Sequence, residues 1–120
     1  MDFLSTLLQL QTQLRIYHWQ TDSYAAHKAL GNAYESLDES IDSFVEEFMG
    51  KYGKIRSEKG FNITLKNIDE SDINSVINTA IEFLSKQLPS LLQDEDTNLL
   101  NIRDEMLGTL EKLKYLLTLK

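Results

Sequence analysis

Apolar side chains recur at intervals of three and four residues along most of the chain, which is the spacing of one face of an α-helix. Such series predict helices over residues 2–20, 24–49, 70–88 and 96–118. The longest series lies in the second of these helices and consists of His27, Leu30, Tyr34, Leu37, Ile41, Phe44 and Phe48. Four helices packed around one shared core predict an all-α four-helix bundle that forms a single domain, residues 1–120.

The connections between the predicted helices differ in length and composition. Residues 20–23 form a short polar link, which makes the first two helices antiparallel neighbours. Asp69 can cap the third helix, and Pro89 ends it. Residues 51–68 hold five of the twelve lysines and arginines and lack a helical series, so we expect a connection that crosses the bundle between the second and third helices. Its alternating apolar residues, which permit a short extended piece, are Phe61, Ile63 and Leu65.

The amino-acid composition argues against several classes of protein and of binding site. The chain has 120 residues, of which 42% are apolar and 26% charged, as is typical of a globular domain. A net charge of −7 makes binding of double-stranded DNA unfavourable, since DNA-binding surfaces are basic. The sequence has no apolar run long enough to cross a membrane, no cysteine for a disulfide or a thiolate site, and no secretion signal. We therefore expect a cytoplasmic protein with no membrane partner.

Carboxylates crowd the second predicted helix, where several of them stand one helical turn apart. The members of this acidic ladder are Glu35, Asp38, Glu39, Asp42, Glu46 and Glu47. Like charges one turn apart each cost a few tenths of a kcal/mol. No lysine or arginine lies between Lys28 and Lys51 to offset the repulsion. Two interpretations are open: a solvated acidic face, or a surface that a cation or a partner neutralises.

Both histidines of the chain, His18 and His27, precede this ladder. Imidazole and carboxylate groups are ligands that proteins use for iron and zinc. Each histidine also fits a buried, hydrogen-bonded core position, so the pattern alone leaves both interpretations open. His27 and Asp42 are ~22 Å apart along one helix, so they cannot hold the same ion within one chain. They can do so if two copies of helix 24–49 pair in antiparallel orientation about a two-fold axis, which would create two equivalent sites.

The YHW motif at residues 17–19, followed by His27 and by the pair Asp42 and Glu46, resembles the signature of the Dps branch of the ferritin-like family. Residues 94–100, DEDTNLL, are similar to the start of the fourth helix in that family. The resemblance covers the first two predicted helices and part of the last one. It implies a ferritin-like four-helix bundle whose iron-oxidising site lies between two-fold-related subunits.

The same resemblance implies a function and a set of ligands. Ferrous iron would be oxidised at the inter-subunit site, usually by peroxide, and stored as ferric mineral inside a twelve-subunit shell. Zinc is a possible substitute for iron. The residues that the resemblance assigns to iron binding and oxidation are His18, His27, Asp42 and Glu46. Asp38, one turn before Asp42 in the acidic ladder, is a further candidate metal ligand.

The chain departs from the Dps pattern in several respects. The link between the two histidines is shorter than in the family, and Gly31 stands where the family often has an acid. The basic segment 51–68 replaces a small helix, and the chain is short and has no lysine-rich N-terminal tail. Short chains of this type also occur in phage genomes. Two outcomes are open: an intact site without the shell, or a site that has lost its chemistry.

Two rival hypotheses come from other functional classes. The first is a catalytically silent helical interaction or structural protein that retains the Dps-like homodimer through helix 24–49. The second is a DNA-protecting protein, which the net charge disfavours. Iron titration with and without peroxide separates the iron-oxidising hypothesis from the silent dimer.

Overall fold

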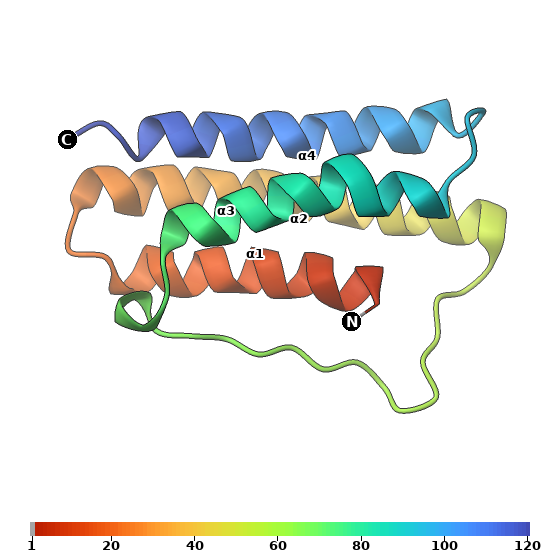
Figure 1. Ribbon diagram of the computed structural model, residues 1–120, viewed down its shortest axis with the longest axis horizontal. Coiled ribbons are helices and arrows are strands. Elements are labelled where there is room, and N and C mark those ends of the chain that lie inside the picture. The colour runs from red at the N-terminus through yellow and green to blue at the C-terminus, as the bar shows by residue number, and fades with distance from the viewer. Residues whose placement is uncertain (1) are drawn as a thin grey trace.

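The chain folds into four helices in the computed structural model, which describes residues 2–120 (Figure 1). Their bounds are Phe3–Gln20 for α1, Tyr24–Tyr52 for α2, Ile73–Glu82 for α3 and Thr97–Leu116 for α4. Three shorter helical pieces are the 3-10 turn η1 (Ile68–Glu70), the π-helical turn η2 (Phe83–Gln87) and the 3-10 turn η3 (Leu88–Leu91). The prediction of an all-α four-helix bundle is confirmed, and none of the described residues forms a strand.

The helices form two antiparallel pairs (Figure 1). A short link joins α1 to α2, and α4 runs back along α2 after α3. Between the two pairs, residues 53–72 return along the length of α1 to the other end of the bundle, so α3 runs in the same direction as α2. The expected crossing connection is therefore present. Within residues 2–120, no helix combines the length and the apolar character that a membrane span needs.

Local capping explains most helix ends. Ser23 accepts a hydrogen bond from the amide of Ala26 at the start of α2. Gly53 ends α2 with a φ of 92°, a left-handed conformation that favours glycine. The third helix begins later than the sequence predicts because Asp72, and not Asp69, caps it. Asp69 lies in η1 instead.

The third predicted helix becomes irregular in its second half because of Pro89. Proline lacks an amide hydrogen, and its ring would collide with the carbonyl group four residues earlier in a regular α-helix. The chain widens into η2, where the amide of Leu88 donates to the carbonyl oxygen of Phe83. Arg103 of α4 donates to the carbonyl oxygen of Leu84 within this turn at 3.1 Å. The side chain of a neighbouring helix thus binds a main-chain group in the irregular turn.

Glutamine side chains of α1 hold the crossing connection against the bundle. Each accepts a hydrogen bond from a main-chain amide of the connection or of η1 at 2.8 Å, and the pairs are Gln9 with Thr64, Gln13 with Lys66 and Gln20 with Ile68. Gln13 also donates to the carbonyl oxygen of Lys66 at 2.8 Å. Helix side chains therefore bind the main-chain groups that a neighbouring strand would bind in a sheet. The extended piece that residues 61–65 permit does not become a strand.

One hydrophobic core fills the bundle and draws on all four helices. Its largest fully buried side chains are Leu7, Leu14, Tyr17, Leu30, Leu37, Phe44, Ile77, Leu84, Leu88, Leu99, Met106 and Leu110. Burying a side chain of this size stabilises the fold by about 1.5–3 kcal/mol. Leu30, Leu37 and Phe44 belong to the series that predicted the second helix, so the buried face of α2 is the predicted one.

A buried carboxylate ties the end of α2 to the start of α4. Asp96 is 1% exposed and accepts hydrogen bonds from the Gln93 amide, the Lys51 ammonium group and the Tyr52 hydroxyl group. These bonds, and that from the Gln93 amide most of all, lower the pKa of Asp96 to about 2. The folded-state pKa lies below the unfolded one. Ionised Asp96 therefore stabilises the fold above pH ~4, and this stabilisation is lost as the pH falls towards 2.

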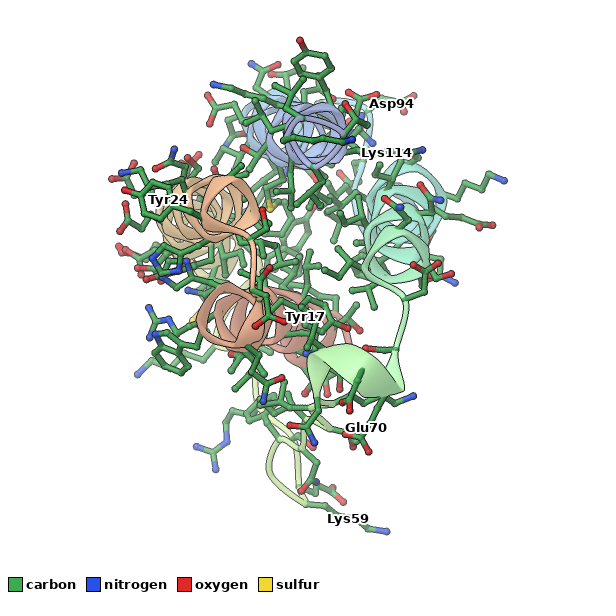
Figure 2. The ribbon with its side chains drawn as sticks, turned by 90° about the vertical axis from the view of Figure 1, so that its left-hand side faces the viewer. Tyr17, Tyr24, Lys59, Glu70, Asp94 and Lys114 are labelled. Carbon is green, nitrogen blue, oxygen red and sulfur yellow. The ribbon has the colours of Figure 1, made fainter. Side chains whose placement is uncertain are left out.

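Replacing Asp96 with asparagine should lower the thermal midpoint by several degrees at pH 7, because the charge that Lys51 and Tyr52 bind is removed. The difference from wild type should shrink as the pH falls from ~4 to about 2, because Asp96 of the unfolded chain takes up its proton near pH ~4 and Asp96 of the folded chain only near pH ~2. Circular dichroism melts from pH 2 to pH 7 measure this. The matched control is Asp94→Asn, which neutralises an exposed acid two residues earlier (Figure 2). If Asp96→Asn and Asp94→Asn lower the thermal midpoint equally at pH 7, the buried carboxylate of Asp96 does not have the stabilising role described above.

Candidate metal-binding face

The two histidines stack on each other beside the link between α1 and α2. Their ring centroids are 3.9 Å apart, and the angle between the ring planes is 15°. His18 lies in the last turn of α1 and His27 in the first turn of α2, so the short link brings them together. Both side chains are half-buried, which distinguishes them from core residues such as Tyr17.

Hydrogen bonds fix the tautomer of each ring. Nδ1 of His18 lies 2.6 Å from the carbonyl oxygen of His27, and Nδ1 of His27 lies 2.8 Å from the carbonyl oxygen of His18. A carbonyl oxygen can only accept, so each Nδ1 carries a proton and donates it. In a neutral imidazole the free lone pair is then on Nε2. Metal-ligating histidines characteristically donate the other ring proton to a carbonyl or carboxylate group, and both rings meet this condition.

A glycine one turn after His27 makes room for the ring of His18. A Cβ atom on Gly31 would lie 2.9 Å from Cε1 and 3.1 Å from Nδ1 of that ring. A larger residue would therefore displace His18, because side chains in a close-packed site have little space to move. Tyr34 contacts the same ring edge-on, with centroids 5.3 Å apart. Gly31 is therefore a steric requirement of the histidine pair.

The acidic ladder lies exposed along α2, and two of its members already have neighbours. Asp38 accepts a hydrogen bond from Gln11 of α1 at 2.8 Å, and Glu47 accepts one from α4 at 2.7 Å. Asp42 and Glu46 are exposed, and neither side chain forms a hydrogen bond or an ion pair within residues 2–120. Their carboxylate oxygens are the most available ones among the candidate ligands.

A single chain does not complete the predicted site. In the part of the chain that the structure describes, no group of three or more histidine, aspartate and glutamate side chains is placed to hold one ion. The structure brings His18 and His27 together, but Asp42 and Glu46 remain ~22 Å or more from His27 along the axis of α2. Because α2 is one continuous helix from Tyr24 to Tyr52, no bend brings the two halves together.

Exposed aromatic side chains surround the histidine pair. Trp19 is 65% exposed and Tyr24 is 75% exposed, and Figure 2 shows Tyr24 on the side of α2 that points away from α3. Arg15 of α1 places its guanidinium group 4.6 Å from the centre of the Tyr34 ring. We call this surface the α1–α2 face, and its members are Arg15, His18, Trp19, Tyr24, His27, Tyr34 and the acidic ladder. The roles of Arg15, Gln11 and Gly31 have no local sequence signal, since each acts on a residue of the other helix.

Comparisons with known proteins give a family but no activity. The sequence profile of a family described as "Family of unknown function (DUF5856)" matches residues 18–117. An "uncharacterized 14.6 kDa protein in mobD-ri intergenic region" of Enterobacteria phage T4 is 26% identical over 119 residues, which cover 99% of this chain and 88% of the phage protein. No solved structure matches the chain. Neither description assigns a ferritin-like family or a metal.

Gly31→Ala should displace His18 and break its hydrogen bond to His27. Alanine is favoured over glycine in a helix by about 1 kcal/mol, but overpacking costs about 1–3 kcal/mol, so we expect no gain in the free energy of unfolding. The matched control is Gly108→Ala in α4, where a Cβ atom would meet nothing within 4 Å. That substitution should stabilise the fold by about 1 kcal/mol.

Urea unfolding and nitrogen-15 spectra of the imidazole rings measure these two effects. Equal stabilisation by both alanines, with unchanged His18 resonances, would show that Gly31 is not required for the histidine pair.

Proposed function

The chain belongs to the DUF5856 family, and we propose that it is a metal-binding protein that takes up ferrous iron between two copies of itself. In this proposal, His18 and His27 of one copy and Asp42 and Glu46 of the other bind the ion, and iron is oxidised at the same place. The observation that carries the proposal is the reciprocal pair of Nδ1 hydrogen bonds between two stacked rings, which leaves the lone pair of each Nε2 atom free to bind an ion. The resemblance of these residues to the Dps signature supports it.

The chemistry of the residues fits a ferrous or zinc ion. Imidazole nitrogen and carboxylate oxygen are donors that such ions take in proteins. The main-chain carbonyl groups hold both histidines in the ligating tautomer before any ion arrives, so binding requires little rearrangement of the rings. Asp42 and Glu46 are neighbours on one side of α2, so both can approach the same ion.

An antiparallel pair of α2 helices would join the two halves of the site. His27 of one copy faces Asp42 and Glu46 of the other if the two-fold axis crosses α2 near Glu35, midway between the two halves. The face is open for this, because α3 lies on the opposite side of the bundle from Tyr24 (Figure 2). An isologous contact of this kind creates two equivalent sites in each dimer.

Iron is a substrate in this proposal. The histidine nitrogens position the ion, and the carboxylates place negative charge beside it. Ferric iron carries one more positive charge than ferrous iron, so the carboxylates favour oxidation. Two ferrous ions would each give one electron to one hydrogen peroxide molecule from solution, which takes up two protons and leaves as two water molecules. The net charge of −7 attracts cations to the surface. Trp19 and Tyr24 would shield the site from water once a second copy covers them.

A second candidate function is a structural or interaction dimer without metal chemistry. The reciprocal histidine bonds fasten α1 to α2 in the absence of any ion, and they satisfy two partly buried polar groups. Double-stranded DNA is a partner in neither case, because the chain carries a net charge of −7 and only five of its twelve lysines and arginines gather in one segment. The response of the folded protein to metal distinguishes the two functions.

Zinc, or ferrous iron without oxygen, should raise the thermal midpoint of the wild-type protein. An ion that binds only the folded state stabilises it by about 2.7 kcal/mol at one hundred times its dissociation constant. His27→Ala and Asp42→Asn should each remove most of the shift in a calorimetric scan. Glu111→Gln neutralises an exposed acid of α4 and should retain the shift. A wild-type midpoint that neither metal changes would favour the silent dimer.

The double substitution Asp42→Asn and Glu46→Gln should have opposite effects with and without metal. In chelator, removing two like charges from each chain should strengthen the dimer, because repulsion between the acidic ladders of the two copies is relieved. With zinc present, the same change should weaken the dimer, since ligation requires ionised carboxylates. Sedimentation equilibrium under both conditions measures the sign. Equal effects with and without zinc would identify these residues as a solvated acidic surface.

A further inference from the structure

Arg15 lies on the α1–α2 face with no carboxylate partner in its own chain. Its guanidinium group stacks over the ring of Tyr34 at 4.6 Å, and none of the ion pairs within residues 2–120 includes it. The side chain is half-buried, so its stem is covered and the aromatic ring holds its head in position. A guanidinium group that is held in this way can bind a carboxylate with two parallel hydrogen bonds.

The carboxylates of the same face lack cations. Asp38 receives one hydrogen bond from the uncharged side chain of Gln11. Glu35, which follows Tyr34, is exposed and forms no ion pair among the described residues. Within one chain, therefore, neither Arg15 nor these carboxylates form an ion pair with each other among the described residues.

The level of Arg15 along the bundle decides which carboxylates it can reach. The contact with Tyr34 places it beside the middle of α2. In the proposed dimer, the two-fold axis would cross α2 near Glu35, so Arg15 would lie within about one helical turn, ~5 Å, of the axis along α2. An antiparallel second copy presents its own Glu35 and Asp38 at the same level.

We propose that the α1–α2 face binds a second copy of the chain through Arg15, which pairs with Glu35 and Asp38 of the partner subunit. The inference rests on the dimer in the proposed function, but it needs no metal. Symmetry repeats the contact on both sides of the axis. The Tyr34 ring holds each guanidinium group toward the partner, and the partner's carboxylates lose part of their mutual repulsion.

Sedimentation equilibrium in chelator tests the contact without the metal. Arg15→Glu should weaken self-association roughly 10- to 100-fold, because each of the two contacts then sets like charges against each other. Adding Glu35→Arg or Asp38→Arg to the same chain should restore most of the loss. Lys114→Glu changes the net charge equally on another helix (Figure 2) and should leave association unchanged. Raising the salt concentration should weaken the wild-type dimer more than the Arg15→Glu dimer.

The outcomes separate this inference from the metal site. If Arg15→Glu associates like wild type, or if neither charge reversal restores association, the contact is wrong even where zinc still raises the thermal midpoint. If the charge reversal succeeds and no metal shift occurs, the contact stands and the metal proposal fails. A wild-type monomer in both chelator and zinc overturns both. If Arg15→Glu does not fold, Arg15→Gln keeps the stem, and unchanged association of that variant overturns the contact.

Discussion

The imidazole rings of His18 and His27 each donate the Nδ1 proton to the main-chain carbonyl oxygen of the other residue, and this exchange joins the end of α1 to the start of α2. The stacked arrangement depends on the short link between the helices and on Gly31, whose missing side chain leaves space for His18. The same bonds set the tautomers, so one interaction both fastens the helix hairpin and leaves the lone pair of each Nε2 atom without a hydrogen-bond partner among the described residues. Loss of either histidine would remove one of the two hydrogen bonds and one of the two Nε2 atoms.

The length of α2 then separates this pair from the carboxylates that would complete a metal site. A straight helix cannot fold back on itself, so the two half-sites stay ~22 Å or more apart in one chain. Three features of the α1–α2 face remain unexplained in a single chain: the exposed Trp19 and Tyr24, the acidic ladder, and Arg15. In the proposed dimer, a second copy in antiparallel orientation would cover the aromatic rings and give Arg15 and the carboxylates near it partners of opposite charge. One symmetric contact would then account for these three features.

The sequence predicts the helix positions well where neighbouring residues determine them. It predicts them less well where contacts with residues far along the chain determine the structure. The three-and-four spacing located α2 and its buried face, but the helix continues through Gly50 to Tyr52, past the predicted end at residue 49. The predicted bounds of the third helix were wrong at both ends. Asp72, and not Asp69, caps its start. The π turn that follows α3 depends on Pro89 and on a hydrogen bond from Arg103 of α4. Likewise, the connection is held by glutamines more than forty residues away, which no local pattern reveals. For the site, residue types and spacing were sufficient to select candidates, but the tautomers required coordinates.

Mixing two inactive variants tests the inter-chain site most directly. One variant would carry His18→Ala and His27→Ala, and the other Asp42→Asn and Glu46→Gln, so each alone lacks half of every site. Random pairing should make about half of the dimers mixed, and each mixed dimer should contain one complete site where a wild-type dimer contains two. The mixture should therefore bind about one quarter of the zinc that wild type binds per chain. Equilibrium dialysis after co-refolding would measure that recovery. If the mixture binds no more zinc than the two variants alone, the half-sites do not meet across a two-fold axis and the account is contradicted.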